Sequence, residues 1–129
     1  MKDLVEKSGL GGEFYIESAA TSTEELGNDI YPPAKAKLRE KGIPFSRRGA
    51  RQMSKRDYSA FDLIVAMDSY NLRNIMRIIG SDSEGKVCRL LDFTAKKGRD
   101  IDNPWYSGDF ERAYNDIAEG CRGLLDSLR

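Results

Sequence analysis

The sequence predicts an α/β domain with a parallel sheet and helices on both faces. Short runs rich in aromatic, β-branched and aliphatic residues alternate with segments of helical periodicity along the chain. The strongest run, residues 63–67, is apolar at consecutive positions, which is typical of a strand covered on both faces. Because consecutive parallel strands need a right-handed crossover between them, this alternation favours a parallel sheet.

The composition fits a single domain over residues 1–129 and excludes several kinds of site. The 21 Lys and Arg residues balance the 21 Asp and Glu residues, so no excess charge indicates a nucleic acid or membrane partner. There is no histidine, which excludes Ser-His-Asp and Cys-His arrangements and His-ligated metals within these residues, and no cofactor is expected. The longest aliphatic run is too short to span a bilayer and no signal peptide is visible, so a cytoplasmic protein is expected.

The first third of the chain predicts a helix end, a strand and a further helix. Residues 1–10 have the apolar spacing of an amphipathic helix that ends in glycine, yet no N-cap residue precedes it. We therefore expect an N-terminally truncated chain that lacks a leading strand. Residues 13–18 are rich in aromatic and β-branched residues and predict a strand, and residues 33–41 predict a helix that begins with proline and ends at Gly42.

The rest of the chain supplies two more strands and three helices. A capping-box pattern at Ser54–Asp57 predicts a short helix through Phe61, before the strand at 62–67. Asp68 and Ser69 then cap a helix to residue 79. Residues 86–91 predict a strand, and residues 108–128 carry apolar side chains at helical spacing throughout.

Four segments in order resemble the low-molecular-weight protein tyrosine phosphatases. These segments are residues 18–22, then 50–52 with 57–58 and 61–62, then 66–72, and last the stretch Asn-Pro-Trp-Tyr-Ser-Gly-Asp-Phe at 103–110. By composition alone the last stretch is a loop with an aromatic anchor. The resemblance runs along the whole chain and implies the phosphotyrosine phosphatase I-like fold, with a phosphotyrosine-containing protein or a small aryl phosphate as substrate.

The family's chemistry uses a cysteine thiolate followed by five residues and an arginine. The thiolate attacks phosphorus and forms a phosphocysteine, while backbone amides and the arginine hold the phosphate oxygens. An aspartic acid protonates the tyrosyl oxygen as it leaves. Here the sixth residue after Cys88 is Thr94 and the sixth after Cys121 is Ser127, so neither cysteine begins the pattern. We expect both to be free core thiols, and the chain alone to lack a nucleophile and activity.

The resemblance also assigns the general-acid position to Asn103, where the family has aspartate. An amide has no proton to donate at neutral pH, so the loss should slow the first chemical step by roughly 10²–10⁴. Asp102 is a candidate substitute. Trp105 and Tyr106 would form a wall of the substrate cleft, and Glu24 lies where some members place an aromatic residue on the opposite wall.

Four further residues match positions that support the family's phosphate loop. Ser18 matches a serine that holds the loop, although a buried serine at a strand end is an equal alternative. Asp68 and Asn71 match a corner beside the site and also suit an N-cap with its first turn. Arg48 falls where many members have a histidine.

Basic residues at 47, 48, 51, 55 and 56 could favour phosphorylated partners, with a solvated helix approach as the alternative.

Two other functions and one mode of association are left open. A non-catalytic phosphatase-like binding or regulatory domain is the main alternative, since the nucleophile loop is absent and position 103 is an amide. Arsenate reduction is a lesser one, because it needs two further cysteines and residues 68–86 contain none. Without a leading strand, the strand at 62–67 would have an unpaired edge, through which the chain could self-associate.

Overall fold

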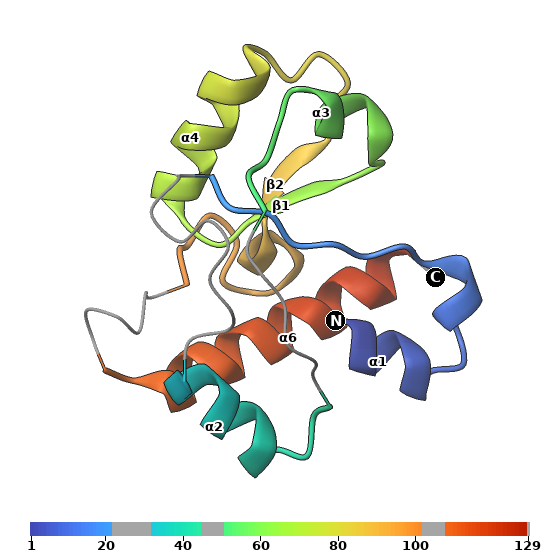
Figure 1. The fold of residues 1–129 in the computed structure, drawn as a ribbon, viewed down its shortest axis with the longest axis vertical. Helices are drawn as coiled ribbons and strands as arrows, with labels where there is room; N and C mark the ends of the chain where they lie inside the picture. Colours follow the sequence, from blue (N-terminus) through green and yellow to red (C-terminus); the bar gives the residue numbers. More distant parts are fainter. Residues whose placement is uncertain (22–31, 45–50, 102–107, 129) are drawn as a thin grey trace.

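The computed structural model describes residues 1–21, 32–44, 51–101 and 108–128 of the chain (Figure 1). Its sheet consists of β1 (Ile64–Ala66) and β2 (Val87–Arg89), which pair in parallel with Ile64 opposite Val87. The crossover between them is α4 (Ser69–Ile79), as the predicted alternation of strand and helix requires.

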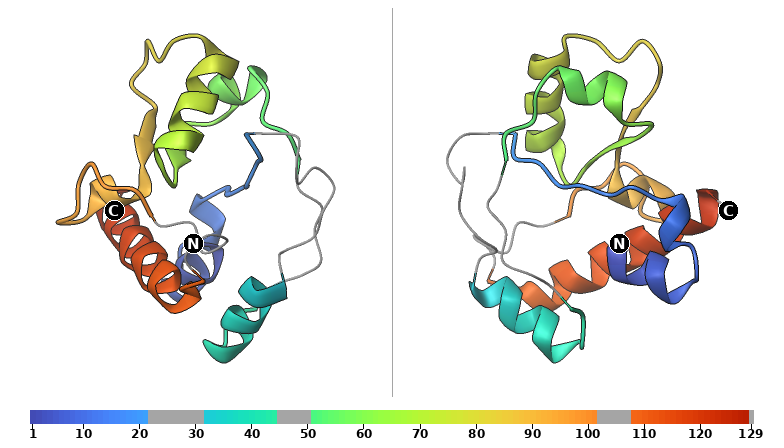
Figure 2. Two further views of the ribbon diagram at one scale, coloured as in Figure 1. Left: turned by 90° about the vertical axis from the view of Figure 1, so that its left-hand side faces the viewer. Right: turned by 45° about the vertical axis from the view of Figure 1, so that its right-hand side comes forward.

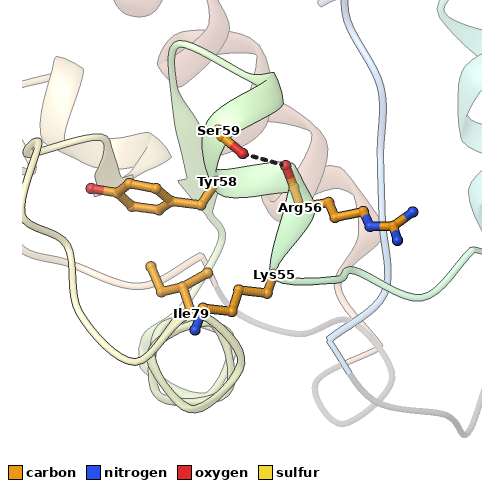
Figure 3. Close-up of a pocket in the computed structure, with 5 residues that line it drawn as sticks. All are labelled: Lys55, Arg56, Tyr58, Ser59 and Ile79. Carbon is orange, nitrogen blue, oxygen red and sulfur yellow. Dashed lines mark hydrogen bonds between the residues drawn. The ribbon is translucent and has the colours of Figure 1, made fainter.

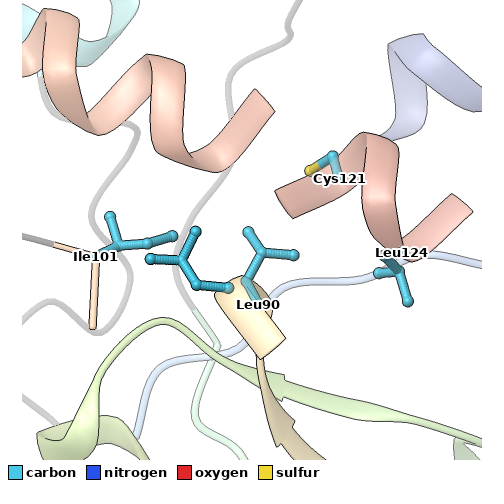
Figure 4. Packing of buried hydrophobic residues seen from close by; sticks show 5 residues of the cluster. Leu90, Ile101, Cys121 and Leu124 are labelled. Atoms are coloured by element: carbon cyan, nitrogen blue, oxygen red, sulfur yellow. The ribbon is translucent and has the colours of Figure 1, made fainter. Parts of the chain in front are cut away.

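Both faces of β1 are covered, which confirms the predicted fold class. Ile64 and Ala66 pack on one side with α4 residues. Leu63 and Val65 pack on the other side, in a cluster that Cys121 and Leu124 of α6 (Phe110–Leu128) join (Figure 4). Successive side chains of a strand point to opposite faces, so an apolar run without alternation forms two cores.

Helix α6 is the main support of the second core. The 3-10 turn η2 (Leu90–Phe93), which directly follows β2, packs closely on α6. Gly120 and Gly123 of α6 face Leu90 and Phe93 of this turn. Helices α1 (Lys2–Lys7) and α2 (Pro32–Glu40) lie against the same helix (Figures 1 and 2). None of the helices in the described ranges is long and apolar enough to cross a membrane.

The predicted helices are confirmed, with ends that follow local signals. Asp68 caps α4 by accepting a hydrogen bond from the Asn71 amide, and the helix ends at Gly80, whose φ of 83° favours glycine. Helix α3 (Arg56–Ala60) uses half of the expected capping box, because the Asp57 carboxylate accepts from the Ser54 amide at 2.9 Å while no side chain caps the helix at Lys55.

The strand predicted at residues 13–18 is wrong. Residues 11–13 form a 3-10 turn, η1 (Gly11–Glu13). Phe14 is extended, but residues 14–19 pair with no strand in the described part of the chain. An isolated parallel bridge nearby joins Ala20 to Gln52. Composition favours an extended backbone here, but a strand also needs a neighbour for its N–H and C=O groups.

The strands predicted at 62–67 and 86–91 are real but shorter than expected. The second is cut short because Leu90 begins the 3-10 turn η2. This turn is fixed by Asp92, whose carboxylate accepts from the Arg89 amide at 3.0 Å and from the Gly98 amide at 2.8 Å. A side chain that bonds nearby amides competes with the strand ladder for them.

Candidate functional site

The carboxyl ends of β1 and β2 meet two other segments at one edge of the sheet. The Met67 carbonyl, just after β1, accepts a hydrogen bond from the Ile101 amide at 2.9 Å. The Ala20 segment lies beside residues 51–53, since the Met53 amide donates to the Ala20 carbonyl at 2.8 Å. This edge is where open parallel sheets place ligand sites, because several loops end together there.

The first group at this edge is a polar corner at the start of α4. Asp68 Oδ1 accepts from the Asn71 amide at 2.7 Å and so holds the first turn of the helix. The side-chain amides of Asn71 and Asn74 both donate to the Thr21 hydroxyl at 3.4 Å. The corner therefore connects the Ala20 segment to α4. The prediction that Asp68 is the N-cap of this helix and that Asn71 lies in its first turn is confirmed.

A second group connects the ends of both strands to the segment before Ile101. The Ser69 hydroxyl donates to Asp100 Oδ1 at 2.9 Å and receives a hydrogen bond from Arg89 Nη2 at 3.2 Å. Arg89 Nε lies 3.3 Å from the same Asp100 oxygen. Partial burial opposes ionisation of Asp100, but hydrogen bonds from Ser69 and the charge of Arg89 together lower its pKa.

A third group lies beside the Ala20 bridge. Arg51 donates to both carboxylate oxygens of Asp57, at 3.1 Å each, and to Glu17 at 3.3 Å. The hydrogen bond from Arg51 is the main reason that the pKa of Asp57 is lowered. Of the five basic residues predicted to bias the rim, Arg51 is thus neutralised by two carboxylates, whereas Lys55 and Arg56 are exposed.

Neither cysteine has the surroundings of a nucleophile. Cys121 is buried in the core on α6. Cys88, on β2, is half-buried, and burial raises the pKa of its thiol to about 11, with the charges of Asp92 and Asp82 adding to the effect. A reactive cysteine needs the opposite, a positive field that stabilises the thiolate. Both residues are free thiols, as expected from the sequence.

The structure places three of the predicted site residues. Asp68 and Asn71 lie in the polar corner, while Ser18 is exposed, so its alternative as a buried serine at a strand end is wrong. The other six lie outside the described residues, namely Glu24, Arg48, Asp102, Asn103, Trp105 and Tyr106. No group of three or more potential metal-ligating side chains occurs in the ranges that the structure describes.

The sequence interpretation assigned no role in the site to Thr21, Ser69, Arg89 or Asp100. Ser69 could have been found from the sequence, because it follows the carboxyl end of the strand predicted at 62–67, whereas Arg89 lies inside the strand predicted at 86–91. Asp100 and Thr21 carry no such signal, since Asp100 bonds to Ser69, 31 positions away, and Thr21 bonds to Asn71, 50 positions away. The arrangement provides hydrogen-bonding groups at a loop-lined edge, but no thiolate.

Comparison with known proteins identifies the family. The family model described as low molecular weight phosphotyrosine protein phosphatase matches residues 1–129. The low molecular weight protein-tyrosine-phosphatase YfkJ of Bacillus subtilis is 34% identical over 129 residues, which cover 99% of this chain and 83% of that protein. The human low molecular weight phosphotyrosine protein phosphatase is 32% identical over 132 residues, covering 97% of this chain and 81% of that protein.

Solved structures agree with these matches. The crystal structure of YfkJ superposes with a TM-score of 0.92 and covers 98% of this chain and 80% of that chain. A Drosophila protein described as an arginine phosphatase superposes with a TM-score of 0.86 at 27% identity, covering 99% of this chain and 85% of that chain. The sequence match over the full 129 residues and the shared parallel sheet with its helices show that this chain belongs to the low molecular weight phosphotyrosine protein phosphatase family.

Proposed function

We propose that residues 1–129 form one phosphatase domain whose reaction is the hydrolysis of phosphotyrosine through a phosphocysteine. The observation that carries this proposal is the match of the family model along the whole chain. The substrate would be a phosphotyrosine-containing protein or a small aryl phosphate, as the descriptions of the Bacillus and human relatives indicate for those proteins. The reaction needs no metal or other cofactor, because the thiolate and hydrogen-bond donors supply the chemistry.

The nucleophile in this proposal is neither Cys88 nor Cys121. Support comes from the sequence, in which neither begins a Cys-to-Arg pattern, and from the raised pKa of the Cys88 thiol and the burial of Cys121. The chain by itself would therefore not turn over an aryl phosphate. Joined behind a family strand and Cys-to-Arg loop, it would supply the polar corner of Asp68 and Asn71, with Ser18 and Arg48 beside the loop.

The remaining roles are assigned by family position. Asn103 occupies the general-acid position, with Asp102 as the candidate substitute. Trp105 and Tyr106 form one wall for the substrate ring, and Glu24 stands on the opposite wall. A polar wall at Glu24 would contact the peptide around the phosphotyrosine rather than the ring itself.

The test compares three proteins: the chain alone, a fusion with a family strand and Cys-to-Arg loop ahead of Met1, and the same fusion with that cysteine changed to serine. Each is assayed with a phosphotyrosine peptide and with the same peptide carrying phosphoarginine, because one structural relative is described as an arginine phosphatase. We expect turnover of phosphotyrosine by the fusion alone. Turnover by the chain alone that disappears in Cys88→Ser would show that the assignment of the nucleophile is wrong.

The non-catalytic alternative makes a different prediction for the same proteins. A binding or regulatory domain would retain the phosphotyrosine peptide without hydrolysing it, even with the loop supplied. The comparisons do not favour this alternative, since the matched relatives named above are described as phosphatases. Binding without turnover in the fusion would reverse that preference.

A further inference from the structure

The outer side of α4 is basic and carries no acidic residue. Arg73 and Arg77 are the charged side chains of Ser69–Ile79, and both are exposed. They stand four residues apart, so they project from the same side of the helix. Neither forms an ion pair with a carboxylate in the described part of the chain. This side of α4 therefore presents two uncompensated positive charges to solvent.

An apolar depression lies between these arginines and the core. Its volume is about 450 Å³, and Leu72 and Met76 line it together with Arg73 and Arg77. Leu72 and Met76 are partly buried against the cluster that contains Ile75. Because these side chains are held by the core, the floor of the depression is fixed while its rim is charged.

A second depression, of about 390 Å³, adjoins the end of the same helix. Ile79 lines it from α4, and Lys55 and Arg56 line it from the start of α3 (Figure 3). Figure 3 shows the Lys55 side chain running alongside Ile79, while the Ser59 hydroxyl donates to the Arg56 carbonyl at 3.2 Å. Since Ile79 follows Met76 by three residues, the two depressions contact successive turns of α4.

The cations that line the two depressions are exposed. The net charge of the protein is zero, and other cations such as Lys37 and Lys96 contact carboxylates within 3 Å. We define the α3–α4 basic surface by four exposed cations that have no such partner among the described residues: Lys55, Arg56, Arg73 and Arg77. A local excess of positive charge attracts anionic partners and raises their rate of association.

We propose that the α3–α4 basic surface docks an acidic peptide segment of a partner protein. An apolar side chain of that segment would enter the depression over Leu72 and Met76, while its carboxylates pair with Arg73 and Arg77 at the rim. An apolar centre with a charged rim is the usual composition of a peptide-binding groove. Membrane binding is less well served by the depression itself, because it requires apolar side chains that project from the surface, whereas Leu72 and Met76 are partly buried.

This docking requires no turnover, so binding alone tests it. The probe is a fluorescein-labelled peptide of repeated Glu-Glu-Leu-Leu units, and binding to the 129-residue chain is followed by anisotropy. We expect saturable binding that weakens with added salt. Charge reversal in the double variant Arg73→Glu, Arg77→Glu should weaken binding about tenfold or more, whereas Arg73→Lys, Arg77→Lys should retain most of it.

The matched control reverses two cations on the opposite side of the sheet. Lys2 on α1 and Arg122 on α6 are exposed, so Lys2→Glu, Arg122→Glu produces the same change in net charge. Thermal unfolding of each variant confirms that it is folded. An equal loss of binding in this control would overturn the proposal, because net charge and not the surface would then control binding.

Two more probes separate the alternatives. A peptide in which every leucine is replaced by serine keeps the charge, and we expect it to bind at least several-fold more weakly; equal binding would overturn the role of the apolar depression. Vesicles of phosphatidylserine and phosphatidylcholine test a lipid surface instead. If the chain binds these vesicles through Arg73 and Arg77 but does not bind the Glu-Glu-Leu-Leu peptide, the proposed occupant is wrong.

Discussion

The Cys88 thiol is held in its protonated form by its place in the fold. It lies half-buried on β2, and burial with two nearby carboxylates raises its pKa to about 11. An ordinary cysteine, with a pKa of about 8.5, is roughly one quarter thiolate at pH 8, whereas a pKa near 11 leaves only about one part in a thousand. A nucleophilic cysteine lies next to positive charge that stabilises its thiolate. Cys88 has no such surroundings, so its role is to pack in the core.

This difference predicts slow modification of Cys88. In the variant Cys121→Ala, which leaves Cys88 as the single thiol, an aromatic disulfide reagent at pH 8 should react on the order of a hundredfold more slowly with the folded chain than with the chain in urea. The rate for the folded chain should still rise about tenfold per pH unit above pH 9, where the unfolded chain levels off. Equal rates at pH 8 would contradict the raised pKa.

In the fusion that carries the Cys-to-Arg loop, we expect Asn103 to limit the first chemical step. Because an amide cannot protonate the leaving oxygen, Asn103→Asp should raise turnover of phenyl phosphate by roughly 10²–10⁴. The gain should be much smaller for nitrophenyl phosphate, whose phenolate leaves without help. Stopped assays for released phosphate measure both substrates under the same conditions.

The control for that experiment is the neighbouring carboxylate. Asp102→Asn should leave the turnover of phenyl phosphate in the fusion unchanged if position 103 is the acid position. If it abolishes that turnover, Asp102 is the acid and the assignment by family position is wrong. If neither substitution affects either substrate, the loop has a structural role and the binding-domain alternative gains support.

The close approach of α6 to η2 depends on glycine. A Cβ at Gly123 would overlap the Phe93 carbonyl, which is backbone and cannot rotate away. Alanine is favoured over glycine by about 1 kcal/mol in a helix, but overpacking a core costs about 1–3 kcal/mol. Here the added methyl group would push α6 away from η2, and these two elements form one core. We predict that Gly123→Ala lowers the free energy of unfolding by about 1–2 kcal/mol, measured by urea denaturation.

The matched control for that variant is Gly12, in the 3-10 turn η1. A Cβ there has nothing within 4 Å, and its φ is not positive, so Gly12→Ala should leave the urea midpoint unchanged or raise it slightly. If Gly123→Ala is as stable as the unsubstituted chain, α6 is not held at the distance from η2 that the structure gives.

The ion pair at the start of α3 predicts how stability depends on pH. Because the pKa of Asp57 is lowered in the folded chain, its contribution to stability is complete above the unfolded value of about 3.9 and is lost as the pH falls through the folded value. The urea midpoint of the unsubstituted chain should therefore fall more steeply below about pH 4 than that of Asp57→Asn. Asp62→Asn, an exposed aspartate, is the control, and parallel curves for Asp57→Asn would contradict this prediction.

Sequence predicted the elements whose causes are local. The long amphipathic pattern of α6 and the cap at Asp68 lie within one segment each, so both helices were placed correctly. The strand at 13–18 was not, because pairing depends on a neighbour that composition does not specify. The N-cap at Asp68 depends only on its own helical turn and is confirmed, whereas the contact of Arg89 with Asp100 through Ser69 joins separate segments and has no local signal.

Among the described residues, the two-stranded sheet has an open edge along β1. β1 pairs with β2 on one side, and no other strand of the described residues pairs with it. The Ile64 amide donates to the Lys86 carbonyl at 2.9 Å, so it points toward β2. Since amides of successive residues alternate in direction along a strand, the Val65 amide points toward the open edge. Both faces of this strand are apolar, which makes the edge an attractive template for another strand.

We therefore predict that the 129-residue chain self-associates through β1. Sedimentation velocity should show a mean mass that rises with protein concentration, and hydrogen exchange should report where the contact forms. In dilute protein the Ile64 amide is protected and the Val65 amide exchanges freely; in concentrated protein the Val65 amide becomes protected as well, because a second strand then accepts its hydrogen bond. If the chain associates while the exchange of the Val65 amide is unchanged, the contact forms elsewhere than at β1. A chain that stays monomeric at all concentrations and unfolds sharply and cooperatively on heating would show that the edge of β1 is covered within the chain itself.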